Sequence, residues 1–125
     1  MKPITGITLL VFTLLLFSNF NFIYAQNSTN IQYDAVIKDS IYNNNRLNVL
    51  NFSSRDFDAL FFEFFDKKAA PTILSKREFY SYTICIAIYS ERLAALYPNQ
   101  KAIATESKNK WFAESYTDYV KTKKL

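Results

Sequence analysis

The stretch SYTICIAIYS, Ser81–Ser90, decides whether this chain is entirely helical or contains a sheet. Large side chains alternate with small ones along it, and its β-branched and aromatic residues favour a strand. The residues that flank it favour a helix instead. Ser75 and Glu78 form a capping box, S-x-x-E, and no Gly, Pro or Asn follows until Pro98. Within that interval apolar residues recur three and four positions apart, at Phe79, Tyr82, Ile86, Tyr89, Leu93 and Leu96.

A strand in this region would also need a partner. RLNVLNF, residues 46–52, is the only fair candidate, and a lone two-stranded pair is marginal in water. We therefore predict one central helix of about 20 residues whose middle is apolar all round. The alternative is an α+β fold with a short strand around residues 80–89.

Two further helices are expected before this central one. Tyr33, Val36, Ile37 and Ile41 share one helical face, and the run Asn43–Asn45 is expected to end that helix. Residues 47–52 are compatible with a helical turn or an extended piece.

The second helix is expected to begin after Ser53, with Phe52 and Phe57 in hydrophobic-staple positions. Lys67 and Lys68 suit its last turn, and Pro71 prevents its continuation. One apolar stripe is expected along it, formed by Phe57, Leu60, Phe61, Phe64 and Phe65.

A last helical segment is expected from the cap Asn99 toward Val120. On a continuous helix Ile103 would lie nearly opposite Phe112, so we expect a break within residues 105–109. Together these segments predict an all-α fold, a small antiparallel bundle of about four helices.

Residues 1–25 have the pattern of a cleaved signal peptide. Lys2 supplies the positive charge, an apolar run follows, and Ala25 precedes the expected cleavage point at Gln26. The rival interpretation is an uncleaved anchor, but Asn19 and Asn21 interrupt the apolar run. We expect a periplasmic or secreted protein with no stable membrane span after cleavage, in which residues 26–125 form a single helical domain.

Composition excludes several classes of function. The chain has no histidine, one cysteine and one glycine, and that glycine, Gly6, lies in the expected signal peptide. Glycine-dependent phosphate loops, dinucleotide turns and nucleophile elbows are therefore absent from residues 26–125. Without histidine there is no Ser-His-Asp triad and no Cys-His pair. We expect no cofactor and no transition-metal site.

The remaining candidate catalytic groups have ordinary structural explanations. Cys85 is expected to be a small buried side chain. Ser107 and Lys110 match S-x-x-K but lack the companion motifs of penicillin-recognising enzymes, and a solvated helix start explains them. The spacing of the acidic residues fits neither calcium binding nor glycoside hydrolysis, which leaves a solvated helix face for Asp56, Asp58, Glu63 and Asp66.

The chain carries 15 Lys and Arg against 11 Asp and Glu, a net charge of +4 spread along its length. Nucleic-acid binding would require a denser basic patch, so no nucleic-acid partner is expected. Asn27–Thr29 and Asn51–Ser53 are N-glycosylation sequons, which matter only in a eukaryotic secretory pathway.

These exclusions favour a non-enzymatic domain that binds another protein in the envelope or outside the cell. An inhibitor, an immunity-type protein or a subunit of an envelope assembly fits that description. The alternative is a small saccharide-binding module or enzyme that uses Tyr, Lys and carboxylate side chains. The sequence identifies no catalytic residue, and its binding residues are unknown at this stage.

Overall fold

The computed structural model describes residues 32–124. The chain divides into two compact units, Met1–Ala35 and Val36–Leu125, and only the second is described at length below. The expected signal peptide, the cleavage point at Gln26 and the first sequon all lie outside the described residues. Helical residues run from 32 to 50, of which 36–50 belong to the second unit.

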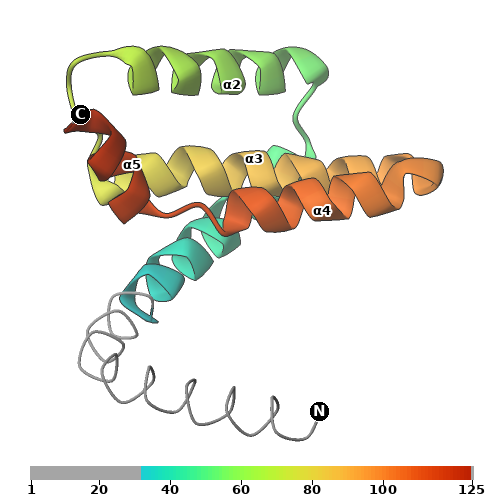
Figure 1. Cartoon of the computed structure of the whole chain (residues 1–125). Coiled ribbons are helices and arrows are strands. Elements are labelled where there is room, and N and C mark those ends of the chain that lie inside the picture. The colour runs from blue at the N-terminus through green and yellow to red at the C-terminus, as the bar shows by residue number, and fades with distance from the viewer. Residues whose placement is uncertain (1–31, 125) are drawn as a thin grey trace, which may run out of the picture. The chain divides into compact units, whose positions relative to one another are not determined.

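Every regular element among the described residues is a helix. After residue 50 follow α2 (Ser54–Ala69), α3 (Lys76–Leu96), a 3₁₀ turn (Pro98–Gln100), α4 (Lys101–Phe112) and α5 (Tyr116–Lys123). Figure 1 shows α2, α3 and α4 running antiparallel, each to the next, with α2 above the α3–α4 pair and residues 36–50 below it. The all-α prediction is confirmed. The alternative with a strand around 80–89 is wrong, because those residues lie in the middle of α3.

α3 is the central helix of the unit. The Ser75 hydroxyl caps it by accepting the Glu78 N–H at 3.1 Å, as the capping box predicts. From Thr83 to Ser90 every residue is buried. The strand-like composition of this stretch therefore has the expected cause, which is burial on all sides of a helix.

The prediction that the first helical segment ends at Asn43–Asn45 is wrong. The helix continues through residue 50. The Asn45 amide donates to the Ile41 carbonyl at 2.8 Å, so its polar group is satisfied within the helix. One turn later Val49 is only 1% exposed. Its burial favours the helical interpretation of the ambiguous residues 47–50.

The expected break within residues 105–109 is also wrong. α4 is continuous to Phe112, and the chain turns at residues 113–115 instead. The continuous helix leaves Ile103 69% exposed, so Ile103 and Phe112 do not need to share a face. Asn99 lies inside the 3₁₀ turn, and α4 begins without a side-chain cap.

Two tyrosines hold α5 against the loop between α2 and α3. The Tyr119 hydroxyl accepts the Leu74 N–H at 2.9 Å, and the Tyr116 hydroxyl donates to the Leu74 carbonyl at 2.6 Å. In the same region Lys123 donates to the carbonyls of Lys68 and Ala70 at the end of α2. These contacts fix the C-terminal helix beside the start of α3.

Candidate functional site

Cys85 has the environment of a structural residue. It lies on the fully buried part of α3, where its side chain is 8% exposed. Burial raises the pKa of the Cys85 thiol from 9.0 to about 11, so the group stays protonated at neutral pH. A protonated, inaccessible thiol is a poor nucleophile, which agrees with the role expected from the sequence.

The other sequence candidates do not converge on a reactive centre. Asp56 accepts the Ser53 N–H at 3.0 Å in a capping box, and this hydrogen bond lowers the pKa of its carboxyl. Glu63 Oε1 lies 4.0 Å from Lys67 Nζ on the surface of α2. Ser107 is half-buried in the middle of α4, not at the expected helix start. Within residues 32–124 no three potential metal-ligating carboxylates or thiols come together.

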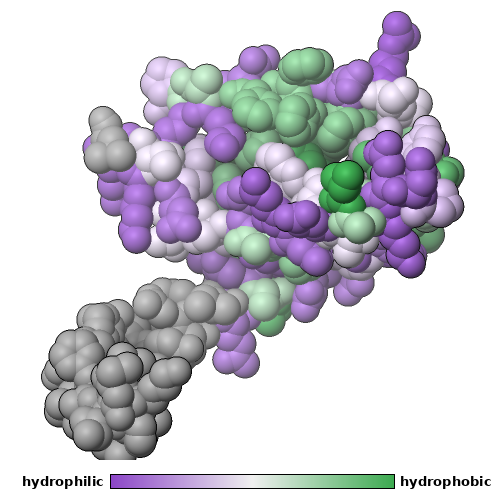
Figure 2. Space-filling view, turned by 45° about the vertical axis from the view of Figure 1, so that its right-hand side comes forward, coloured by the Kyte–Doolittle hydropathy of each residue, from purple (hydrophilic) through white to green (hydrophobic). Residues whose placement is uncertain are grey.

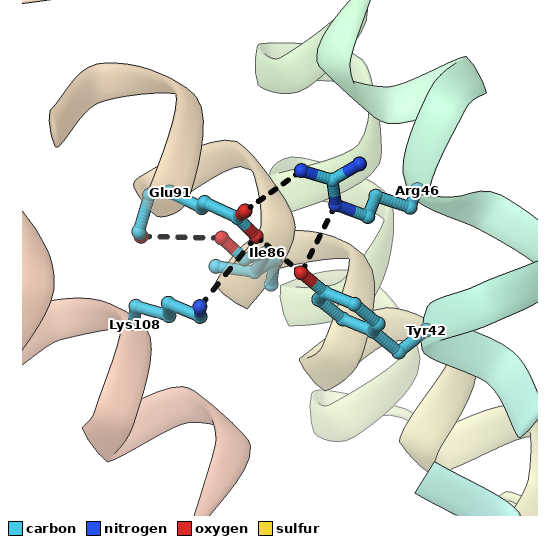
Figure 3. A network of polar contacts seen from close by, with 6 residues as sticks. Tyr42, Arg46, Ile86, Glu91 and Lys108 are labelled. Atoms are coloured by element: carbon cyan, nitrogen blue, oxygen red, sulfur yellow. Dashed lines mark hydrogen bonds and ion pairs between the residues drawn. The ribbon is translucent and has the colours of Figure 1, made fainter. Parts of the chain in front are cut away.

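The structure does assemble a polar network between helices that our sequence analysis did not predict. The Tyr42 hydroxyl donates to Glu91 Oε2 at 2.7 Å, and Arg46 Nη2 lies 3.3 Å from Glu91 Oε1. Arg46 Nε also donates to the Tyr42 hydroxyl at 3.1 Å. Lys108 Nζ lies 3.6 Å from Glu91 Oε2. Figure 3 shows the result, in which the first helical segment, α3 and α4 meet at one carboxylate.

The electrostatics of this network favour a structural role. Burial alone would raise the pKa of Glu91, but the hydrogen bond from Tyr42 and the charges of Lys108 and Arg46 outweigh it and lower the pKa. Burial, together with the hydrogen bond to Glu91, raises the pKa of Tyr42. Neither group therefore titrates near neutral pH, where a general acid or base is most effective. The network links three helices, and we call Tyr42, Arg46, Glu91 and Lys108 the polar network.

The second notable feature is an aromatic surface on α2. Of the five residues in the expected stripe only Phe64 is fully buried, at 1% exposed. Phe65 is 46% exposed, and Phe62, which lies outside the stripe, is 64% exposed. Phe61 is half-buried beside them, with its ring centroid 4.8 Å from that of Phe65. We call Phe61, Phe62 and Phe65 the α2 aromatic surface. Figure 2 shows apolar side chains gathered over α2, at the top of the view.

The inner side of α2 is anchored by ring contacts that hold this surface in place. Phe57 stacks on Tyr89 of α3 with ring centroids 4.1 Å apart. Phe64 stacks on Tyr82 of α3 at 5.3 Å and meets Trp111 of α4 edge-on at 6.1 Å. Trp111 is thus a half-buried packing residue. The helix that carries the exposed rings is therefore fixed to both neighbouring helices.

Comparisons with known proteins assign neither a family nor a function to this chain. No family model matches the chain, and the searches of curated proteins and of solved structures found no match. Within the part of the chain that the structure describes, no helix combines the length and apolar character needed to cross a bilayer.

Proposed function

We propose that this chain is an exported, non-enzymatic domain that binds another protein through the α2 aromatic surface. The observation that carries the proposal is the exposure of Phe62 and Phe65 beside the half-buried Phe61. Contiguous exposed aromatic side chains on a small domain mark interaction sites, and aromatic residues are enriched at the centres of protein interfaces. The partner would be a protein of the periplasm or the extracellular space.

The surroundings of the surface support a protein partner. Glu63 and Asp66 lie on the same helix as the exposed rings, and Lys67 and Lys68 follow in its last turn. Glu63 pairs with Lys67, and Lys68 Nζ lies 6.0 Å from the Phe65 ring centroid, so both signs of charge lie near the exposed rings, as in the polar rim of a protein interface. A basic membrane-binding face would carry one sign of charge.

The absence of a catalytic role is supported by the way the reactive side chains are used. The Cys85 thiol is protonated and buried. The Glu91 carboxylate is held by a hydroxyl and two cations, which leaves it little capacity to exchange a proton. Both groups serve packing between helices, which is the role expected of them in a binding domain.

The binding part of the proposal is tested by capture of partners from the native envelope or medium. Tagged wild-type protein and the variant Phe62→Ser/Phe65→Ser are compared by mass spectrometry of the bound proteins. A stoichiometric partner should bind the wild type and be lost from the variant, since loss of an interface hot spot weakens affinity about 30-fold or more.

Leu47→Ser is the matched control, because Leu47 is an equally apolar side chain that is 74% exposed on a different helix. The control should retain the partner, and all three proteins should show the same thermal unfolding. Retention of the partner by the double phenylalanine variant would show that binding does not use α2.

The export part of the proposal has its own test. The intact mass or N-terminal sequence of the native protein should correspond to a chain beginning at or near Gln26. Recovery of the full-length chain from the membrane fraction would favour the uncleaved anchor.

A further inference from the structure

A hollow of about 280 Å³ lies between the C-terminal half of α3 and the N-terminal half of α4. Its walls are mainly apolar, and its buried and half-buried polar groups are two serine hydroxyls, while Gln100 and Tyr97 lie at its exposed side. The lining residues are Leu93, Tyr97, Ile103, Ala104, Ser90, Ser107 and the exposed Gln100. No charged side chain lines it. Two neighbouring hollows differ in this respect, because one is lined by Glu91, Lys101 and Lys108 and the other by Glu106, Lys110 and Glu114.

The two serine hydroxyls have no proton left to donate into this hollow. Ser90 is 6% exposed, and its hydroxyl donates to the Ile86 carbonyl at 3.2 Å. A hydroxyl carries one proton. Either serine could donate in their 3.2 Å contact; with the Ser90 proton on the Ile86 carbonyl, Ser90 accepts and Ser107 donates. The Ser107 oxygen still has lone pairs that can accept a hydrogen bond. Ser107 therefore acts as a hydrogen-bond acceptor toward the hollow.

We propose that this hollow binds a small neutral molecule with an apolar body and one hydrogen-bond donor, such as an alcohol or a phenol. The donor would bond to the Ser107 hydroxyl oxygen, and the apolar body would cover Leu93 and Ala104. A charged ligand is disfavoured because no lining residue would neutralise its charge. The volume lies just below the usual range of about 300 to 1,000 Å³ for small-molecule sites, which limits the ligand to about the size of a single substituted ring.

The entrance of the hollow also suits such a ligand. Tyr97 and Ile103 stand at its edge with 55% and 69% of their surfaces exposed. A bound apolar molecule would cover part of both side chains, and burial of apolar surface favours binding. The site uses α3, α4 and the turn between them but no residue of the α2 aromatic surface, so it goes beyond the proposed protein-binding function.

Phenol and anisole form a matched pair of probes. Both have a six-membered aromatic ring, but phenol donates a hydrogen bond and anisole can only accept one. Each is titrated into ¹⁵N-labelled protein expressed from the full-length sequence, and the amide shifts are followed by nuclear magnetic resonance. The shifts should centre on Leu93 and Ala104, with phenol bound about fivefold more tightly than anisole. Anisole is the more apolar probe, so burial alone would give the opposite preference.

Two substitutions of Ser107 test the hydrogen bond itself. Ser107→Val removes the hydroxyl. Ser107→Thr keeps the hydroxyl in a side chain that has the shape of valine. The preference for phenol should disappear in the valine variant and persist in the threonine variant. Ile103→Ser changes a side chain that is mostly exposed, so the fold should survive it, and it should weaken both probes alike. Equal affinities of wild type for the two probes, shifts centred elsewhere, or a preference retained in Ser107→Val would overturn the proposal.

Discussion

Cys85 should react with thiol reagents far more slowly in the folded protein than in the unfolded chain. Burial raises its pKa from 9.0 to about 11. That change lowers the thiolate fraction about 100-fold at about pH 8, and only the thiolate attacks the reagent. The 8% exposure of the side chain adds a steric barrier. The native rate should therefore be at least about 100-fold below the rate in denaturant.

The assay uses an aromatic disulfide reagent that releases a coloured thiol. Rates are measured for the native protein, for the protein in denaturant, and for the reference variant Cys85→Ala/Asn48→Cys. Asn48 is exposed on the first helical segment, so its replacement provides an accessible thiol on the same fold. The reference thiol should react at close to the unfolded rate. The native Cys85 rate should keep rising with pH beyond 10, where a thiol with the ordinary pKa of 9.0 is already largely ionised.

The same pKa change has a consequence for stability. The folded pKa of Cys85 is raised, so its contribution to folding is fully present below about pH 9 and is lost as the pH rises toward about 11. Cys85→Ala should therefore lose less stability across that interval than the wild type. A native labelling rate within tenfold of the reference variant would refute the structural role, and loss of partner binding in Cys85→Ala at unchanged stability would make the cysteine functional.

Three further predictions concern the packing of the helices. Glu91→Gln should cost about 1 kcal/mol of unfolding free energy at neutral pH. Because the folded pKa of Glu91 is lowered, this difference should begin to decline as the pH falls through about 4 and disappear only below the folded pKa, which urea titrations at several pH values would check. Tyr119→Phe should cost about 1 to 3 kcal/mol in the same assay, since it leaves the buried Leu74 N–H without its acceptor, and an unchanged stability would contradict the importance of that contact. Ile86→Ala and Ile88→Ala should each cost about 2 to 5 kcal/mol, because both side chains are at most 1% exposed; a much smaller loss at either position would show that one face of α3 is not packed.

Local signals in the sequence were sufficient to locate the helices. The caps at Ser53 and Ser75 and the stop at Pro98 depend only on nearby residues, and the structure has all three. The errors arose where a local signal was weaker than packing. Asn43–Asn45 continues as helix because the helix beyond it buries a valine, and α4 stays continuous because Ile103 is left in solvent.

The polar network could be predicted only in part. Tyr42 and Arg46 are four residues apart, so their contact follows from helical spacing alone. Their meeting with Glu91 and Lys108 depends on how three helices pack, and no local pattern specifies that arrangement. The pairing of Ser90 with Ser107 has the same origin. The periodicity of the sequence therefore did not predict the polar contacts between helices in the candidate sites.

The exposed rings of α2 follow from helix geometry. Phe62 and Phe64 are two residues apart, so their side chains point about 160° from each other around the helix axis. A helix that packs Phe64 against α3 and α4 must therefore turn Phe62 toward solvent, as observed. No rotation of α2 on a single supporting layer would bury both rings. The arrangement of phenylalanines along α2 thus places one ring in the core and leaves another on the outer side, where our proposal puts the protein partner.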